Sequence, residues 1–115
     1  MPLHPARSPF HVAEDGDGTT VYFPAGTALT DAHVEAIGRH PLAGGRDQVA
    51  LTLDLGAVSA LSSGALGKLL ALNRAVRAAG GRLALVNPTP TVRRVFKLTR
   101  LDTVLDVRDA PALSL

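Results

Sequence analysis

The stretch that decides the fold runs from Gln48 to Gly80 and reads QVALTLDLGAVSALSSGALGKLLALNRAVRAAG. Within residues 49–55, apolar residues at the odd positions alternate with smaller or polar residues at the even positions. This period of two predicts a strand with one buried face. After a predicted loop at 56–61, apolar residues recur at helical spacing from residue 65 to residue 79. The stretch therefore predicts a strand, a loop and a helix in that order.

The junction between this predicted strand and helix carries two serines, Ser62 and Ser63, followed by Gly64. Serine is a favoured helix N-cap, because its side-chain oxygen accepts a hydrogen bond from a backbone N–H of the first turn. The glycine pair at 80–81 predicts the end of the helix, since glycine readily leaves the right-handed helical region. If the chain carries any chemistry, we expect it at this junction.

Shorter elements are predicted before the central unit. Strands at 10–12 and 19–23 flank a turn at 14–18, where Asp-Gly pairs favour a tight turn and the two strands form a hairpin. A helix capped by Thr30 or Asp31 follows. We expect it to bury apolar residues on one face and to end at Pro41 and the glycines after it.

After the central unit, we expect a strand at 82–86, a helix from Pro90 to about residue 98 and a last strand at 104–107. Thr89 before Pro90 is the usual order of N-cap and first helical residue. The element order is therefore ββαβαβαβ. Because the strands alternate in polarity, the helices should cover mainly one face of the sheet. The predicted fold is α/β, with a mixed sheet of four to five strands.

The composition describes a single domain. The chain has 115 residues, of which 46% are hydrophobic and 3% aromatic, so its core must consist mainly of Leu, Val and Ala. We predict a flexible tail at 1–9 and one domain at 10–110. The chain has no cysteine, no apolar run long enough for a membrane span and no leader-like start, which favours a cytoplasmic location. A net charge of +2 with few aromatic residues does not indicate direct nucleic-acid binding.

Several apparent motifs fail on spacing. Residues 64–68, Gly-Ala-Leu-Gly-Lys, lack the first glycine of a phosphate-binding loop and the Ser or Thr after its lysine. Residues 15–18, Asp-Gly-Asp-Gly, lack the later glycine and glutamate of a calcium loop. The histidines show no metal-ligand spacing, and the serine pair lacks the flanking glycines of a hydrolase nucleophile elbow. We therefore predict no catalytic residue, no metal site and no cofactor.

A set of short motifs, in contrast, falls at the separations found in one family. The motifs are Leu53-Asp54-Leu55, Val58-Ser59, Ser62-Ser63, Leu66-Gly67, Gly80-Gly81-Arg82-Leu83, Val86-Asn87-Pro88, Val92-Arg93-Arg94-Val95 and Leu101-Asp102. Together they resemble the STAS domain and, more narrowly, the small bacterial anti-sigma factor antagonists. The resemblance covers residues 49–107 well and the first third of the chain only loosely.

The resemblance implies a STAS fold and a cytoplasmic switch. Such proteins bind an anti-sigma factor that is also an ATP-binding serine kinase, and thereby release a sigma factor. The kinase phosphorylates a serine at the start of the second long helix, which breaks the complex, and a PP2C-type phosphatase restores it. The family's Asp-Ser-Ser-Gly-Leu-Gly falls on residues 62–67 without gaps, which implies that Ser63 is the phosphorylated residue. A shift of one residue would make it Ser62 instead.

The resemblance also implies a surface for the partner around this serine. The residues expected to form or shape that surface are Ser62, Gly64, Leu66, Gly67, Lys68, Asp54, Gly26 and Thr27. Two positions depart from the family: Ser62 replaces the aspartate, and residues 26–29 read Gly-Thr-Ala-Leu in place of Gly-Glu-Leu-Asp.

These lost acidic residues favour a second interpretation, a STAS subunit that is not phosphorylated and serves a lipid-transport ABC complex or a signalling scaffold. A third, lower-ranked interpretation is a site for a nucleotide or another small anion at the start of the helix.

Overall fold

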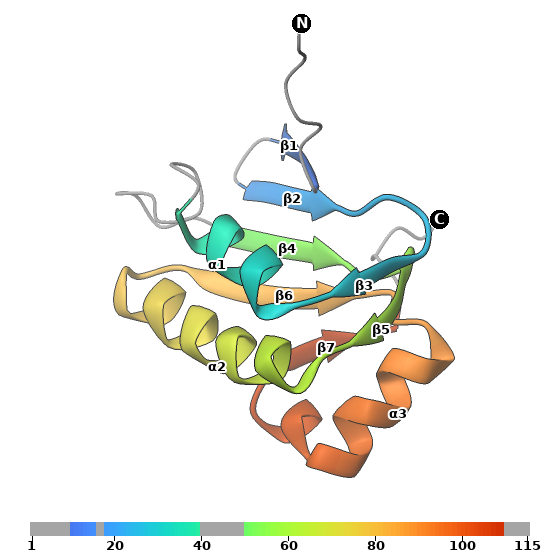
Figure 1. Cartoon of the computed structure of the whole chain (residues 1–115). Coiled ribbons are helices and arrows are strands. Elements are labelled where there is room, and N and C mark those ends of the chain that lie inside the picture. The colour runs from blue at the N-terminus through green and yellow to red at the C-terminus, as the bar shows by residue number, and fades with distance from the viewer. Residues whose placement is uncertain (1–9, 16–17, 40–49, 110–115) are drawn as a thin grey trace, which may run out of the picture.

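The structure, a computed structural model, describes residues 10–15, 18–39 and 50–109. Within these ranges, five strands form one sheet in the order β1 (His11–Asp15), β2 (Gly18–Tyr22), β4 (Ala50–Asp54), β6 (Arg82–Val86) and β7 (Asp106–Arg108) (Figure 1). β1 pairs with β2 in the antiparallel direction, and the other three pairs are parallel. The predicted mixed α/β sheet is therefore confirmed.

A second, two-stranded sheet was not predicted. β3 (Thr27–Leu29) pairs in parallel with β5 (Val58–Leu61), so the prediction of a loop at 56–61 is wrong for residues 58–61. Strands of three and four residues are too short for a period of two to be visible. They also lie beside Gly26 and Gly56, which favour turns.

In the part of the chain that the structure describes, three α-helices accompany the sheets: α1 (Asp31–Arg39), α2 (Ser63–Ala78) and α3 (Pro90–Thr99). The predicted caps of α2 and α3 are confirmed: Ser62 is the N-cap of α2, and Thr89 precedes Pro90 at the start of α3. Gly80 has a φ of +88°, as expected at the end of a helix. A 3-10 turn, η1 (Leu101–Thr103), delays the last strand, so β7 begins two residues later than predicted.

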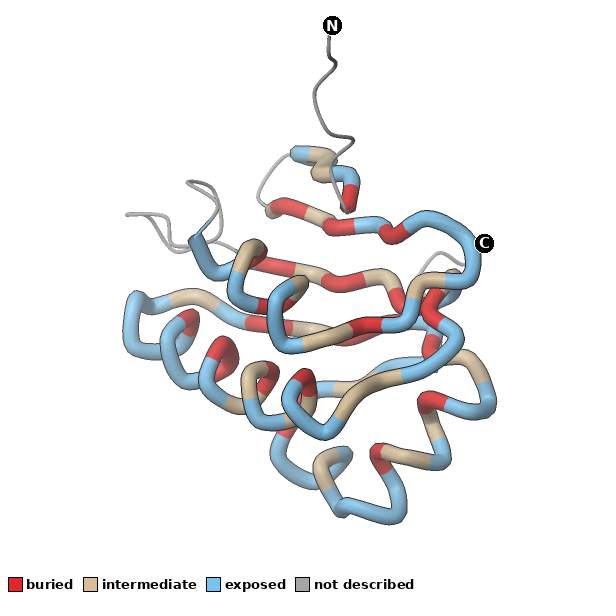
Figure 2. The backbone as a smooth tube through the Cα atoms, viewed as in Figure 1, coloured by how far each residue is buried: buried red, intermediate tan, exposed pale blue. Residues whose placement is uncertain are grey.

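The helices cover mainly one face of the large sheet. On β4 and just after it, Leu51, Leu53 and Leu55 are buried, whereas Ala50 is exposed and Thr52 only half-buried. α1 and α2 lie side by side in front of the sheet, and α3 packs against β5 (Figure 1). The buried positions of the strands and helices face one another between these layers (Figure 2).

Some predictions concern residues outside the described ranges. They are the tail at 1–9, the centre of the hairpin turn at 16–17 and the end of the first helix at Pro41. The first strand, β1, is longer than predicted: it runs from His11 to Asp15, whereas the predicted strand ended at residue 12.

Candidate functional site

The parallel ribbon of β3 and β5 brings the starts of α1 and α2 together. Leu29 and Leu61, the last residues of the two strands, are paired with each other. Just beyond them, the Ser62 N–H donates a hydrogen bond to the Leu29 carbonyl at 2.9 Å. Because the strands run in the same direction and each leads into a helix, the first turns of α1 and α2 lie side by side (Figure 1).

Ser62 caps α2. It has an extended backbone, with φ of −84° and ψ of 162°, and its Oγ accepts a hydrogen bond from the Ala65 N–H at 3.0 Å. The Ser62 side chain is half-buried and its oxygen is already engaged. Sequence reasoning gave either serine of the pair a capping role, and the structure assigns that role to Ser62.

Ser63 is the first residue of α2 and is exposed. Within the described ranges, no hydrogen bond to its hydroxyl is formed. The first backbone N–H groups of a helix have no acceptor within the helix, and the macrodipole is positive at this end. The Ser63 hydroxyl is thus open to another protein, at a place where negative charge is electrostatically favoured.

Gly64 is in close contact with α1. A Cβ at position 64 would lie 3.2 Å from the Cβ and 3.3 Å from the Cγ of Asp31. Asp31 belongs to the first turn of α1, so its carboxylate lies beside the first turn of α2. Sequence reasoning considered Asp31 only as a possible helix cap and missed this contact, because it depends on the pairing of β3 with β5. A carboxylate contributed by another helix therefore lies beside the residue that follows Ser63.

Lys68 forms an ion pair across the two helices. Its Nζ lies 2.6 Å from Glu35 Oε2 on α1, and both side chains are about 40% exposed (43% and 42%). The hydrogen bond and charge of Lys68 hold the pKa of Glu35 below its ordinary value, and Glu35 in turn raises the pKa of Lys68. Lys68 is therefore already paired, although its exposure leaves it able to exchange Glu35 for another anion.

Leu66 and Gly67 differ in what they offer to a partner. Leu66 is half-buried and packs against the hydrophobic core, so much of its side chain serves the fold. Gly67 is exposed, and a Cβ placed there would meet no atom within 4 Å. The surface of α2 above Gly67 is consequently free of side-chain atoms, which allows another backbone to approach closely.

The remaining predicted residues lie away from the helix start. Gly26 and Thr27 are at the beginning of the ribbon, where their carbonyls accept hydrogen bonds from the Ser59 hydroxyl at 3.2 and 3.3 Å. Asp54 accepts a hydrogen bond from the Gly56 N–H at 2.9 Å, in the turn between β4 and β5. In the described part of the chain, no hydrogen bond or ion pair connects these residues to Ser63.

The described residues also bear on two other features, a metal site and a membrane-spanning helix. Among them, no group of three or more His, Cys, Asp or Glu side chains is placed to hold a metal ion. No described helix is both long and apolar enough to cross a membrane.

Comparison with known families identifies the fold. The family model described as "Mlab, STAS domain" matches residues 13–107, which is most of the chain. The chain belongs to the STAS domain family. A comparison with curated proteins finds no match.

Solved structures share the STAS fold with this chain. An anti-sigma-factor antagonist (STAS) domain protein from Planctomyces limnophilus has a TM-score of 0.74 and 22% identity, with 88% of this chain and 90% of that chain covered. TM1081 of Thermotoga maritima has a TM-score of 0.68 and 22% identity, with coverage of 90% and 88%. SpoIIAA, the Bacillus cell fate determinant, has in its unphosphorylated form a TM-score of 0.57 and 23% identity, with coverage of 83% and 96%. The STAS domain described here thus resembles anti-sigma factor antagonists in fold.

Proposed function

We propose that this STAS domain is a cytoplasmic anti-sigma factor antagonist controlled by phosphorylation of Ser63. In the unmodified state it binds an anti-sigma factor that is also an ATP-binding serine kinase, and so releases a sigma factor. Phosphorylation by that kinase ends the complex, and a PP2C-type phosphatase restores binding. The domain acts by binding and has no catalytic residue of its own. The observation that carries the proposal is the exposed Ser63 hydroxyl beside a helix start already capped by Ser62.

The division of roles between the two serines supports Ser63 as the phosphorylated residue. Modification of Ser62 would disrupt the hydrogen bond that caps α2, which contributes roughly 1 kcal/mol to the free energy of unfolding. Modification of Ser63 leaves that cap in place. SpoIIAA is known in both a phosphorylated and an unphosphorylated form, and it shares this fold.

The charges around Ser63 support a switch that acts at the surface. A phosphate adds a charge of about −1.5 to −2 at neutral pH. The helix starts of α1 and α2 favour this charge, the carboxylate of Asp31 opposes it, and Lys68 is occupied by Glu35. The added charge is therefore only partly compensated by the domain itself. A partner docked on this surface would have to tolerate the uncompensated negative charge. An acidic partner surface would be repelled by that charge, and an apolar one would bury it at an unfavourable desolvation cost.

Phosphate transfer to this domain by its kinase tests the proposal. The chain is incubated with the kinase of its own cell and ATP, and its intact mass is measured. We expect one added phosphate in the unsubstituted chain and in Ser62→Ala, and none in Ser63→Ala. Phosphorylation of Ser63→Ala to the same extent would disprove the assignment of the site. No phosphorylation of any form would disprove the switch.

A second candidate function uses the same surface without phosphorylation. Position 62 carries Ser in place of the aspartate of the switch proteins, and residues 26–29 lack their acidic side chains. These departures favour a STAS subunit of a lipid-transport ABC complex or of a signalling scaffold. Affinity purification from the native cell distinguishes the two: an ATP-binding serine kinase supports the switch, and an ABC-type ATPase supports the subunit.

A further inference from the structure

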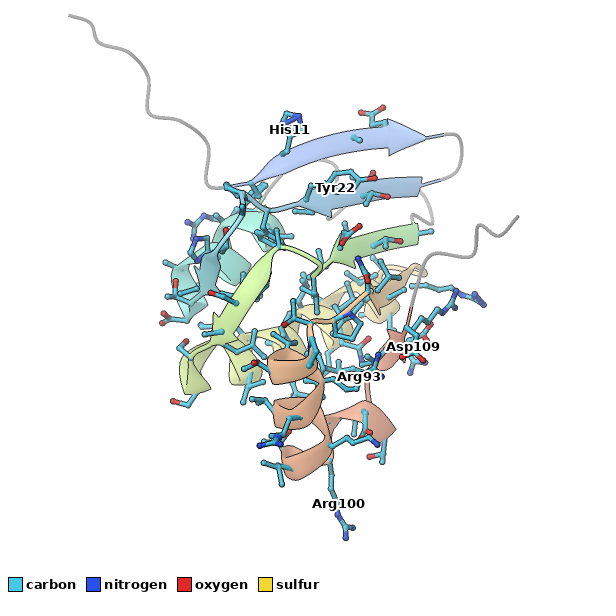
Figure 3. The ribbon with its side chains drawn as sticks, turned by 90° about the vertical axis from the view of Figure 1, so that its right-hand side faces the viewer. His11, Tyr22, Arg93, Arg100 and Asp109 are labelled. Carbon is cyan, nitrogen blue, oxygen red and sulfur yellow. The ribbon has the colours of Figure 1, made fainter. Side chains whose placement is uncertain are left out.

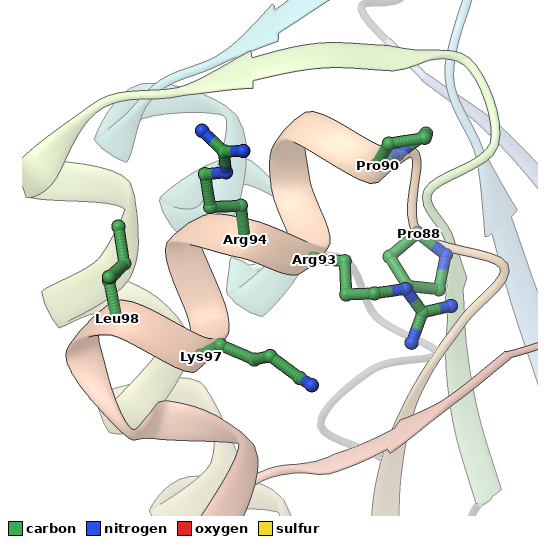
Figure 4. A pocket seen from close by; sticks show the side chains of 6 residues that line it. All are labelled: Pro88, Pro90, Arg93, Arg94, Lys97 and Leu98. Atoms are coloured by element: carbon green, nitrogen blue, oxygen red, sulfur yellow. The ribbon is translucent and has the colours of Figure 1, made fainter.

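The outer face of α3 carries a hollow that has no part in the Ser63 surface. It has a volume of about 440 Å³ and is lined by Pro88, Pro90, Arg93, Arg94, Lys97 and Leu98 (Figure 4). The opposite face of α3 buries Val92 and Phe96 in the core, which fixes the helix against the domain. The hollow is thus a built feature of the surface, formed by one firmly seated helix and the loop before it.

The lining combines apolar surface with positive charge. Leu98 is 77% exposed, an unusual degree for a large apolar side chain. The two prolines add rigid apolar surface at the other end (Figure 4). Three of the six lining residues are cationic and none is acidic. Such a surface attracts negative charge and at the same time offers an apolar contact.

The positive charge of this face is only partly neutralised within the domain. Arg93 pairs with Asp109, which lies just beyond β7 (Figure 3). In the described part of the chain, Arg94, Lys97 and Arg100 form no ion pair, and Arg100 extends away from the body of the domain (Figure 3). Cations that the fold does not use are available to a partner, and complementary charge on that partner would steer its approach.

We propose that this hollow is a docking groove for an acidic segment of a partner protein, separate from the Ser63 surface. An apolar side chain of the segment packs against Leu98 and the prolines, while neighbouring carboxylates pair with Arg94 and Lys97. A concave hollow suits an inserted side chain better than it suits a flat lipid surface. A nucleic acid is less well matched, since no aromatic side chain on which a base could stack lines the hollow.

The test is an NMR titration of the full-length chain with a short synthetic peptide rich in glutamate around one leucine. We expect chemical-shift changes centred on residues 88–98 and weaker binding at higher salt. The double substitution Arg94→Glu with Lys97→Glu should weaken binding by roughly tenfold or more, because like charges then face each other. Leu98→Ser should weaken it severalfold. Arg74→Glu, an exposed charge reversal on α2, is the matched control and should leave affinity unchanged.

Each of the following outcomes would contradict the proposal. A peptide with glutamine in place of glutamate that binds equally well would remove the role of charge. The absence of shifts on α3 at millimolar peptide would remove the groove. Vesicles of phosphatidylglycerol or a short DNA duplex that bind through Arg94 and Lys97, when the peptide does not, would assign the face to a membrane or a nucleic acid. Self-association abolished by Leu98→Ser would assign it to a second copy of the chain.

Discussion

The side chain of Asp31 lies against the backbone of Gly64, with 3.2 Å between the Asp31 Cβ and the place a Cβ would occupy at position 64. This contact joins the first turns of α1 and α2 through two residues that are 33 positions apart in the chain. It leaves a carboxylate beside the residue that follows Ser63. The size of residue 64 and the charge of residue 31 therefore both bear on the candidate site.

Alanine substitutions at two glycines of α2 should differ in their effects on stability. Gly67→Ala should raise the free energy of unfolding by about 0.5–1 kcal/mol, because alanine favours helix and the new methyl meets no atom. Gly64→Ala should gain less or lose stability, since its methyl presses on Asp31. Urea denaturation of both variants measures this difference. An equal gain in the two would show that Asp31 yields without cost.

Alanine substitutions at the two serines should likewise differ in their effects on stability. Ser62→Ala should lower the free energy of unfolding by about 1 kcal/mol, since it removes the cap of α2. Ser63→Ala should change it by less than about 0.5 kcal/mol, as expected for an exposed surface position. The measurement is again chemical denaturation. A larger loss in Ser63→Ala than in Ser62→Ala would contradict the division of roles described for the site.

Local patterns in the sequence were sufficient for much of this fold. The alternation through residues 49–55 correctly predicted β4, and the caps at Ser62 and Thr89 marked the starts of two helices. These features depend on neighbours in the chain. The short strands β3 and β5 could not be predicted in this way, because each is stabilised mainly by the other, about 30 residues away.

The candidate site likewise combines local features that the sequence showed with contacts between distant segments that it did not. The serine pair was visible in the sequence, and so was its place at a helix start. The contact of Asp31 with Gly64 and the ion pair of Glu35 with Lys68 were not, since both require α1 and α2 to lie side by side. Lys68 was expected one turn beyond the serine pair, but its partner within the domain, Glu35, was missed.

Asp31 should oppose negative charge at position 63. In Ser63→Glu, the further substitution Asp31→Asn should recover a few tenths of a kcal/mol more stability than it does in the unsubstituted chain, because it removes a like-charge neighbour. A double-mutant cycle by urea denaturation gives this coupling. Because the interaction is electrostatic and exposed, it should shrink at high salt. A coupling of zero at low salt would show that the two charges do not interact.

The ion pair of Glu35 with Lys68 predicts a pH dependence of known sign. The pKa of Glu35 is lowered from 4.5, so its contribution to stability is present above that value and is lost as pH falls through the lowered pKa. The pKa of Lys68 is raised from 10.5, so its contribution is lost as pH rises through the raised pKa. Carboxyl NMR titration should show the pKa of Glu35 returning toward 4.5 in Lys68→Met. An unchanged pKa would mean that the pair does not persist in solution.

The most direct test of the central claim compares the affinity of two forms of the chain for the anti-sigma factor kinase. Isothermal titration calorimetry is carried out with the unmodified chain and with the chain phosphorylated at Ser63, at the same salt concentration. We predict that the phosphorylated form binds at least roughly tenfold more weakly, because the added charge lies in the contact surface. Equal affinity of the two forms would contradict the account.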